Sequence, residues 1–230
     1  MKIRASEALK HPRWVCGLLL ATCVFIGPVG RLSAWAQRVN DQPLIRVLIY
    51  DYAYVDRLEL KDGENEAAEL FAQAGVRVVW TGYWQEQRRD RGQAENSDAD
   101  FFIRIFPASM ARRWNYKAGA LGDSVIPPGV EGPLRGGCAN VFYDRVQHLS
   151  ILWDMFPGEA LGDAMAHELG HLLLGADHSG EGIMKARWDV QDLELAKGGK
   201  LRFLPAETTA IQRAARSLPR NSPAMVSTLH

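Results

Sequence analysis

Two histidines and a glutamate stand at a spacing that suits metal chemistry. Residues 167–171 read His-Glu-Leu-Gly-His, the H-E-x-x-H pattern. On a helix, side chains four positions apart lie on one face, so His167 and His171 can present two imidazoles to one metal ion. Glu168 lies one step round the helix, beside the metal rather than on it. That is the place for a general base that takes a proton from a water molecule.

The surrounding sequence predicts the helix that this spacing needs. Residues 160–173 carry a broad apolar surface, which is typical of a buried core helix. Gly175 is a natural end for it, because glycine takes the left-handed conformation at a helix end. His178 follows on the turning chain and can bring a third imidazole to the metal. Three protein ligands and one open position for water define a catalytic zinc site, so we expect one catalytic Zn²⁺.

The segment resembles the metzincin clan of zinc peptidases, and most of all its matrixin-like branch. That family's pattern is H-E-x-x-H-x-x-G-x-x-H, often followed by Ser and then by a methionine turn. Here Ser179 follows His178, and Gly182-Ile183-Met184 is similar to the methionine turn. The resemblance implies that Met184 forms a hydrophobic floor beneath the metal and is not a ligand. Taken alone, Met184 would be read as an ordinary core methionine.

The sequence departs from the family pattern at the third ligand. Gly175 and His178 each lie one residue later than the pattern requires, and strict spacing would put Asp177 at the ligand position. Some metzincin-like peptidases use Asp there. Either the helix carries one extra residue and Gly175 and His178 shift together, or Asp177 is the ligand. We favour His178, because the glycine and the histidine move as a unit and imidazole suits zinc.

The sequence before this helix predicts a domain that mixes strands and helices. Runs of β-branched and aromatic residues predict strands at residues 44–55, 76–80, 100–106 and 139–146, and residues 117–126 look like a short, glycine-bearing edge strand, which makes five. Apolar periodicity predicts further helices at 62–74 and 204–217. The first strand, helix and second strand have the lengths of a parallel crossover unit.

This order of elements is similar to the metzincin catalytic domain. The resemblance implies an α+β (α/β-like) fold: a twisted, mixed five-stranded sheet with one antiparallel edge strand, a crossover helix, the active-site helix and a C-terminal helix. In the family the edge strand borders the cleft. The resemblance therefore implies that Gly119, Ala120, Leu121 and Gly122 pair with an extended substrate through main-chain hydrogen bonds. The alternative is an edge strand without that role.

The first 36 residues predict a bacterial-type secretory signal peptide. Basic residues precede an apolar run at residues 14–30, and Ala34-Trp35-Ala36 forms an A-x-A cleavage site before Gln37. We therefore expect cleavage after Ala36 and a secreted or periplasmic protein. An uncleaved membrane anchor is the alternative, because the apolar run nearly reaches spanning length.

Length and composition fit one globular domain with a sizeable core. The chain has 230 residues, of which 47% are hydrophobic. We expect a short lead at 37–43, a zinc peptidase-like domain at 44–218 and a loose tail at 219–230. Residues 1–36 hold five of the 27 basic and one of the 27 acidic residues, which leaves 22 and 26, a net charge of −4. That balance favours neither nucleic acid nor an anionic membrane as a partner after signal cleavage. Cys138 then stands alone, so we expect no internal disulfide.

These features together predict a zinc-dependent endopeptidase that acts on proteins or peptides. Glu168 would take the proton of the attacking water and pass it to the leaving amine. Two alternatives stay open. One is a catalytically silent, zinc-bearing peptide-binding module, which is favoured by the one-residue shift and by Ala186, where some metzincins carry a tyrosine. The other is a hydrolase of non-protein amides, such as cell-wall peptides. Side-chain specificity and oligomeric state are not readable from the sequence.

Overall fold

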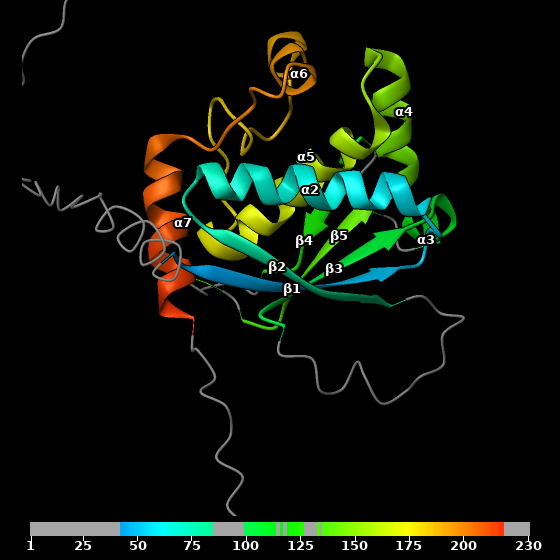
Figure 1. Cartoon of the computed structure of the whole chain (residues 1–230). Coiled ribbons are helices and arrows are strands. Elements are labelled where there is room, and N and C mark those ends of the chain that lie inside the picture. The colour runs from blue at the N-terminus through cyan, green and yellow to red at the C-terminus, as the bar shows by residue number, and fades with distance from the viewer. Residues whose placement is uncertain are drawn as a thin grey trace, which may run out of the picture. The chain divides into compact units, whose positions relative to one another are not determined.

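A five-stranded sheet carries the helices of the domain (Figure 1). The computed structural model describes residues 42–84, 99–113, 116, 119–126, 133 and 135–218. The strands are β1 Leu44–Asp51, β2 Arg77–Trp84, β3 Phe101–Phe106, β4 Gly122–Ser124 and β5 Gly137–Phe142. They lie in the order β2-β1-β3-β5-β4; β1 is parallel to β2 and β3, β3 is parallel to β5, and β4 at the edge is antiparallel to β5. The predicted mixed sheet with an antiparallel edge strand and the predicted parallel crossover are confirmed.

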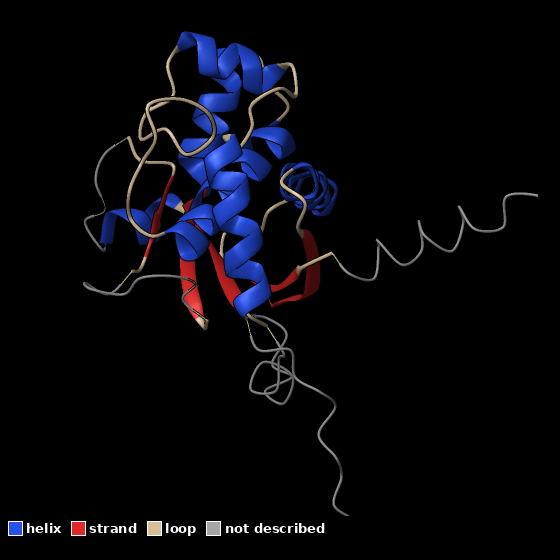
Figure 2. Ribbon diagram, turned by 90° about the vertical axis from the view of Figure 1, so that its left-hand side faces the viewer, coloured by secondary structure: helices blue, strands red, loops and turns tan. Residues whose placement is uncertain are grey.

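The described residues form helices, most of which lie over one face of this sheet. They are α2 Arg57–Gln73, α3 Ala108–Arg113, α4 Tyr143–Trp153, α5 Pro157–Leu174, α6 Val190–Lys197 and α7 Pro205–Ser217. Figures 1 and 2 show α2 and α5 layered on the sheet, with α4 and α6 beyond them. Within the described ranges, every helix falls short of the length and apolar character that a membrane span requires.

The hydrophobic core lies between the sheet and the layer formed by α2 and α5. Alternate side chains of the central strands point into it and are fully buried, among them Ile45, Val47, Ile49, Phe101, Ile103 and Ile105. From the helices, the largest buried side chains opposite them are Leu70, Phe71, Leu161, Met165 and Leu169. This packing fixes α5, which carries the H-E-x-x-H pattern, over the sheet.

Glycines bring α2 and α5 unusually close together. A Cβ atom on Gly158 would lie 2.5 Å from Cβ of Asp62. A Cβ atom on Gly162 would lie 2.5 Å from Cβ of Glu66. Neither position has room for a larger side chain, so the first half of α5 is held directly against the backbone of α2. The site at the other end of α5 is therefore built on a rigid support.

The predicted strand at 139–146 is too long. β5 ends at Phe142, and α4 begins at Tyr143. The sequence predicted a strand as far as residue 146 and no helix after it in this region. The Tyr143 hydroxyl donates a hydrogen bond of 2.9 Å to Oε2 of Glu59 on α2. This contact spans 84 positions of the sequence. It anchors the start of the helix, and local β propensity gives no indication of it.

Helix α6 lies in a polar segment that was not predicted to be regular. Asp189 caps it by accepting hydrogen bonds from the backbone N–H of Gln191 at 2.8 Å and of Asp192 at 3.2 Å. The Asp192 carboxylate in turn accepts from the Asp189 backbone N–H at 2.9 Å. This reciprocal capping box starts the helix, although its apolar stripe is short.

The chain between β1 and α2 turns earlier than predicted. β1 ends at Asp51 rather than at residue 55, because the buried Asp51 carboxylate accepts the backbone N–H of Val55 at 3.0 Å and bends the chain out of the sheet. α2 then begins at Arg57 rather than at residue 62. Asp56 caps it by accepting the backbone N–H of Leu58 at 2.9 Å.

Two strands also differ in length from the prediction. β2 runs on to Trp84, whereas β4 is limited to Gly122–Ser124 within the predicted 117–126. The predicted signal peptide at 1–36 and tail at 219–230 lie outside the described residues, as does most of the predicted lead.

Candidate metal centre and active site

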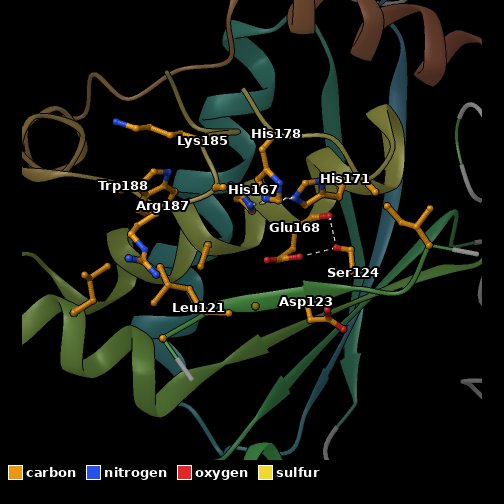
Figure 3. A pocket seen from close by; sticks show the side chains of 18 of the residues that line it. Leu121, Asp123, Ser124, His167, Glu168, His171, His178, Lys185, Arg187 and Trp188 are labelled. Atoms are coloured by element: carbon orange, nitrogen blue, oxygen red, sulfur yellow. Dashed lines mark hydrogen bonds between the residues drawn. The ribbon is translucent and has the colours of Figure 1, made fainter. Parts of the chain in front are cut away.

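Three imidazoles converge at the C-terminal end of α5. His167 and His171 lie on one face of the helix, which continues to Leu174. Gly175 then adopts a φ of +101°, a conformation that L side chains rarely take, and turns the chain so that His178 comes back to the helix. Nε2 of His171 lies 3.2 Å from Nε2 of His167 and 3.2 Å from Nε2 of His178. Figure 3 shows the three rings facing one another.

The spacing of these nitrogens fits a tetrahedral zinc ion. Two nitrogens that each lie about 2.0–2.1 Å from such an ion are about 3.3–3.4 Å apart. In the described part of the chain, these three histidines form the one group of His, Cys, Asp or Glu side chains whose ligand atoms all lie within 4.8 Å of one another. Asp177 is not part of it. The geometry therefore favours the reading in which the helix carries one extra residue and His178 is the third ligand.

Hydrogen bonds on the far side of two rings orient their lone pairs. Nδ1 of His167 lies 2.6 Å from the carbonyl oxygen of Ile183, and Nδ1 of His171 lies 2.9 Å from that of Gly175. A carbonyl oxygen can only accept, so each Nδ1 carries the proton and each Nε2 turns a lone pair toward the centre of the group. Lone pairs facing one another repel unless a cation lies between them. The donor set thus fits a bound Zn²⁺, with backbone carbonyls as the outer partners of its ligands.

Burial keeps two of these imidazoles neutral. It lowers the pKa of His167 to about 4, assisted by the nearby His171 and His178 and opposed by the hydrogen bond to Ile183. Burial likewise lowers the pKa of His171. A neutral imidazole is the form that binds a metal ion, so protons compete weakly at these two positions near pH 7.

Met184 packs against the helix directly beside the histidines. It is 1% exposed, and the backbone N–H of Ser179 donates to its carbonyl oxygen at 3.0 Å, which closes the turn after His178. A Cβ atom on Gly170 would collide with Sδ of Met184. Because Gly170 has no side chain, the thioether of Met184 can lie against α5 at this position. Its role as a hydrophobic floor beneath the metal stays a prediction.

Glu168 is buried next to the three histidines and hydrogen-bonded to the edge strand. It is 5% exposed, and the Ser124 hydroxyl lies 2.7 Å from its Oε2 atom (Figure 3). Burial raises the pKa of Glu168 to about 8, the charge of Asp123 adds to the rise, and the Ser124 hydrogen bond opposes it. A cation at the histidines would lower this pKa and favour the carboxylate. The Ser124 contact joins residues 44 positions apart, and nothing local in the sequence indicates it.

β4 is shaped to receive this carboxyl group. A Cβ atom on Gly122 would lie 2.5 Å from both Cγ and Oε1 of Glu168. Gly122 therefore leaves the space that the carboxyl group fills, while Ser124 supplies the donor. The two residues are two positions apart on the strand, so both face α5.

Two of the four residues predicted to pair with substrate already use their carbonyl oxygens for hydrogen bonds within the chain. Of these four residues, Gly122 lies in β4, whereas Gly119, Ala120 and Leu121 precede it. The Ala120 carbonyl accepts from Nη1 of Arg145 at 2.6 Å, and the Leu121 carbonyl accepts from the Phe142 backbone N–H at 2.8 Å.

The register of β4 identifies which main-chain groups face outward. Leu121 and Val125 bond to β5 through their backbones, and Asp123 stands opposite Asn140 between them. In an antiparallel pair every second residue turns its N–H and C=O away from the partner strand. The groups of Gly122 and Ser124 therefore point to the open edge.

A pocket of about 640 Å³ opens beside the histidines and Glu168. Its floor and walls come from the segment 119–126, from α5, from the loop 185–188, and from α4 and α6. The apolar lining includes Leu121, Leu149, Ala164, Trp188 and Leu193, and the cationic lining consists of Lys185 and Arg187. Leu149 and Leu193 lie on α4 and α6, the two helices whose contribution to the site was not predicted.

Comparisons with known proteins add little to this description. No protein-family model matches the sequence, and no curated protein matches it. The structure is similar to that of archaemetzincin from Methanopyrus kandleri, with 15% identity, 75% of this chain and 96% of that chain covered, and a TM-score of 0.43. It is also similar to metalloproteinase-II from Bacteroides fragilis, with 10% identity, coverage of 76% and 54%, and a TM-score of 0.45. These values are too low to assign a function, which must rest on the geometry of the site.

Proposed function

We propose that this chain is a zinc-dependent endopeptidase of metzincin-like design that acts on proteins or peptides. One observation supports the proposal most. Three imidazole nitrogens converge, two of them each 3.2 Å from Nε2 of His171, beside the buried Glu168 at the wall of a pocket. Metal ligands, a base and a space for substrate thus meet at one place, as hydrolysis requires.

The residues of the chain divide the chemistry between them. Zn²⁺, when bound by His167, His171 and His178, would polarise the scissile carbonyl and lower the pKa of water. Glu168 takes the proton from the attacking water and delivers it to the leaving amine nitrogen. Ser124 holds the Glu168 carboxylate in place.

Substrate would enter along the open edge of β4. The outward main-chain groups of Gly122 and Ser124 offer hydrogen bonds to an extended peptide, as in strand addition. A peptide bound in this way would pass directly in front of Glu168, because Gly122 and Ser124 both lie against the carboxyl group of Glu168.

The proposal is tested by cleavage of a denatured protein substrate with and without a chelator. We expect chelator-sensitive cleavage that is restored by zinc. Glu168→Gln should retain zinc and lower turnover by roughly 10²–10⁴-fold, the range of a positioned acid–base group. Near-normal turnover in this variant would refute the role given to Glu168.

A zinc-bearing peptide-binding module is the second candidate. Ala186 favours it. This exposed residue lines the pocket at the position where some metzincins carry a tyrosine beside the metal, and alanine has no hydroxyl to offer there. Against it stands the buried Glu168 with its fitted surroundings on β4, for which a binding module has no use. Stoichiometric zinc without cleavage of denatured protein or cell-wall peptide would favour the module. Cleavage of the cell-wall peptide alone would favour the amide hydrolase.

We also propose that the protein is exported, on the strength of its first 36 residues. The basic region, apolar run and A-x-A site support this proposal.

A further inference from the structure

The side of the pocket next to His167 has one fixed aromatic wall. The Trp188 indole N–H donates a hydrogen bond of 3.1 Å to the carbonyl oxygen of Ile183. The same oxygen also accepts the hydrogen bond from Nδ1 of His167. The Trp188 ring stands edge-on to the His167 ring, with centroids 6.0 Å apart. A substrate side chain beside the metal on this side would therefore lie against Trp188.

Two cations line the pocket, and their surroundings differ. Nζ of Lys185 lies 2.6 Å from Oδ2 of Asp189 and 2.5 Å from Oδ2 of Asp192, so its charge is balanced by two carboxylates of the same segment. Arg187 is exposed to the pocket and makes no ion pair or hydrogen bond with any residue in the described ranges. Trp188 and Leu121 line the same pocket (Figure 3).

The acidic residues of the pocket do not neutralise Arg187. They are Asp123 and Glu168, and neither carboxylate lies within the 4.0 Å of an ion pair with it. Glu168 is instead held by Ser124 at 2.7 Å. A zinc ion at the histidines would add two positive charges beside these acids. Among the described residues, this guanidinium of the pocket therefore has no counter-ion, and apolar side chains line the same pocket.

We propose that Arg187 binds a carboxylate of the substrate close to the scissile bond, so that the pocket selects peptides with Asp or Glu at that position. The inference rests on the proposed function and deepens it. A guanidinium offers two parallel N–H donors that match a carboxylate, and this match is lost with a neutral amide. The aliphatic part of the acidic side chain would contact Trp188. A free C-terminal carboxylate has the same chemistry and is the other source of such a ligand.

The test uses probes that are anchored at the metal. We would prepare peptide hydroxamates whose hydroxamate group chelates zinc and whose adjacent residue is Glu, Gln or Lys, each with an amidated or a free C-terminus. Binding to the zinc-loaded protein is measured by calorimetry, which needs no turnover. We expect the Glu probe to bind roughly tenfold more tightly than the Gln probe, with the preference shrinking as salt is added.

Variants of Arg187 identify the origin of this preference. In Arg187→Ala the Glu and Gln probes should bind alike, and in Arg187→Glu the Lys probe should become the best ligand. Arg213→Glu is the matched control, because Arg213 is exposed on α7, away from the pocket lining, and the change in charge is the same. It should behave as the parent does.

Each outcome decides the question. Equal binding of the Glu and Gln probes to the parent, or an unchanged preference in Arg187→Ala, overturns the inference and leaves the proposed function standing. If binding depends only on whether the C-terminus of the probe is free, Arg187 recognises a terminal carboxylate and not a side chain. The proposed selection of Asp or Glu is then wrong. If no hydroxamate binds to a zinc-loaded protein, both the site and the inference fail.

Discussion

The hydrogen bond between Ser124 and Glu168 allows a sharp prediction about turnover. The Ser124 hydroxyl lies 2.7 Å from Oε2 of Glu168 and 2.9 Å from its backbone carbonyl oxygen. The hydroxyl has one proton, so it donates to one of these acceptors at a time, and an ionised carboxylate is the stronger acceptor. Ser124→Ala removes this donor and leaves the shape of β4 almost unchanged. The general base then keeps its place on the helix but loses the group that orients it.

The size of the effect follows from the burial of the pair. Glu168 is 5% exposed, so water cannot easily replace the lost donor. A hydrogen bond to a charged group is worth about 1.5–3 kcal/mol, which corresponds to roughly a 10- to 150-fold change in rate. We expect kcat to fall within that range, with KM and zinc content nearly unchanged, because the change removes one hydroxyl and leaves the metal ligands and the main chain of β4 in place.

The pH profile supplies a second readout for the same variant. The Ser124 hydrogen bond lowers the pKa of Glu168, so its loss raises that pKa. A base with a raised pKa stays protonated to higher pH, and the acidic limb of the kcat/KM profile should therefore move to higher pH. Ser124→Thr keeps the hydroxyl and is the matched control. An unchanged kcat and acidic limb in Ser124→Ala, or a Thr variant as slow as the Ala variant, would refute this reasoning.

Three further predictions concern the metal, the stability and the export of the protein. His178→Ala should lose bound zinc while Asp177→Ala keeps it, as measured by metal analysis after dialysis; the reverse result would move the third ligand to Asp177. Asp163 is 2% exposed, its Oδ2 has no partner among the described residues, and burial raises its pKa well above the usual value. A raised carboxyl pKa makes folding less favourable as pH rises above about 3.9, so Asp163→Asn should raise Tm by at least about 2–4 °C more at pH 8 than at pH 5 in calorimetric scans. An equal shift at both pH values would contradict that assignment. N-terminal sequencing of the exported protein should begin at Gln37; a protein that starts at Met1 in the membrane fraction would support an uncleaved anchor instead.

The central part of the site could be predicted because its information is local. His167, Glu168 and His171 lie within one and a half turns of a helix, and the helical repeat alone places them on neighbouring faces. Gly175 and His178 lie within seven residues of His171, so a single glycine turn relates them to the helix. The positions of the central strands along the chain were predictable for a similar reason, because each is a short apolar run bounded by turn residues.

The parts that were missed depend on contacts between distant segments. Ser124 orients Glu168 across 44 positions, and Tyr143 begins α4 through a hydrogen bond to Glu59 across 84 positions. Neither contact leaves a periodic trace in the sequence. α6 is different, because Asp189 and Asp192 stand at capping-box spacing and could have indicated a helix start in spite of the polar surroundings.

The most direct test of the account is X-ray absorption at the zinc edge, combined with metal analysis of the purified protein. We predict one zinc per chain with three imidazole nitrogens at about 2.0–2.1 Å and an oxygen in the fourth position. The spectrum should be unchanged in Glu168→Gln, since Glu168 is beside the metal and not a ligand. A protein that takes up no zinc, or a closed site of four protein ligands, would contradict the claim that His167, His171 and His178 form a catalytic metal centre.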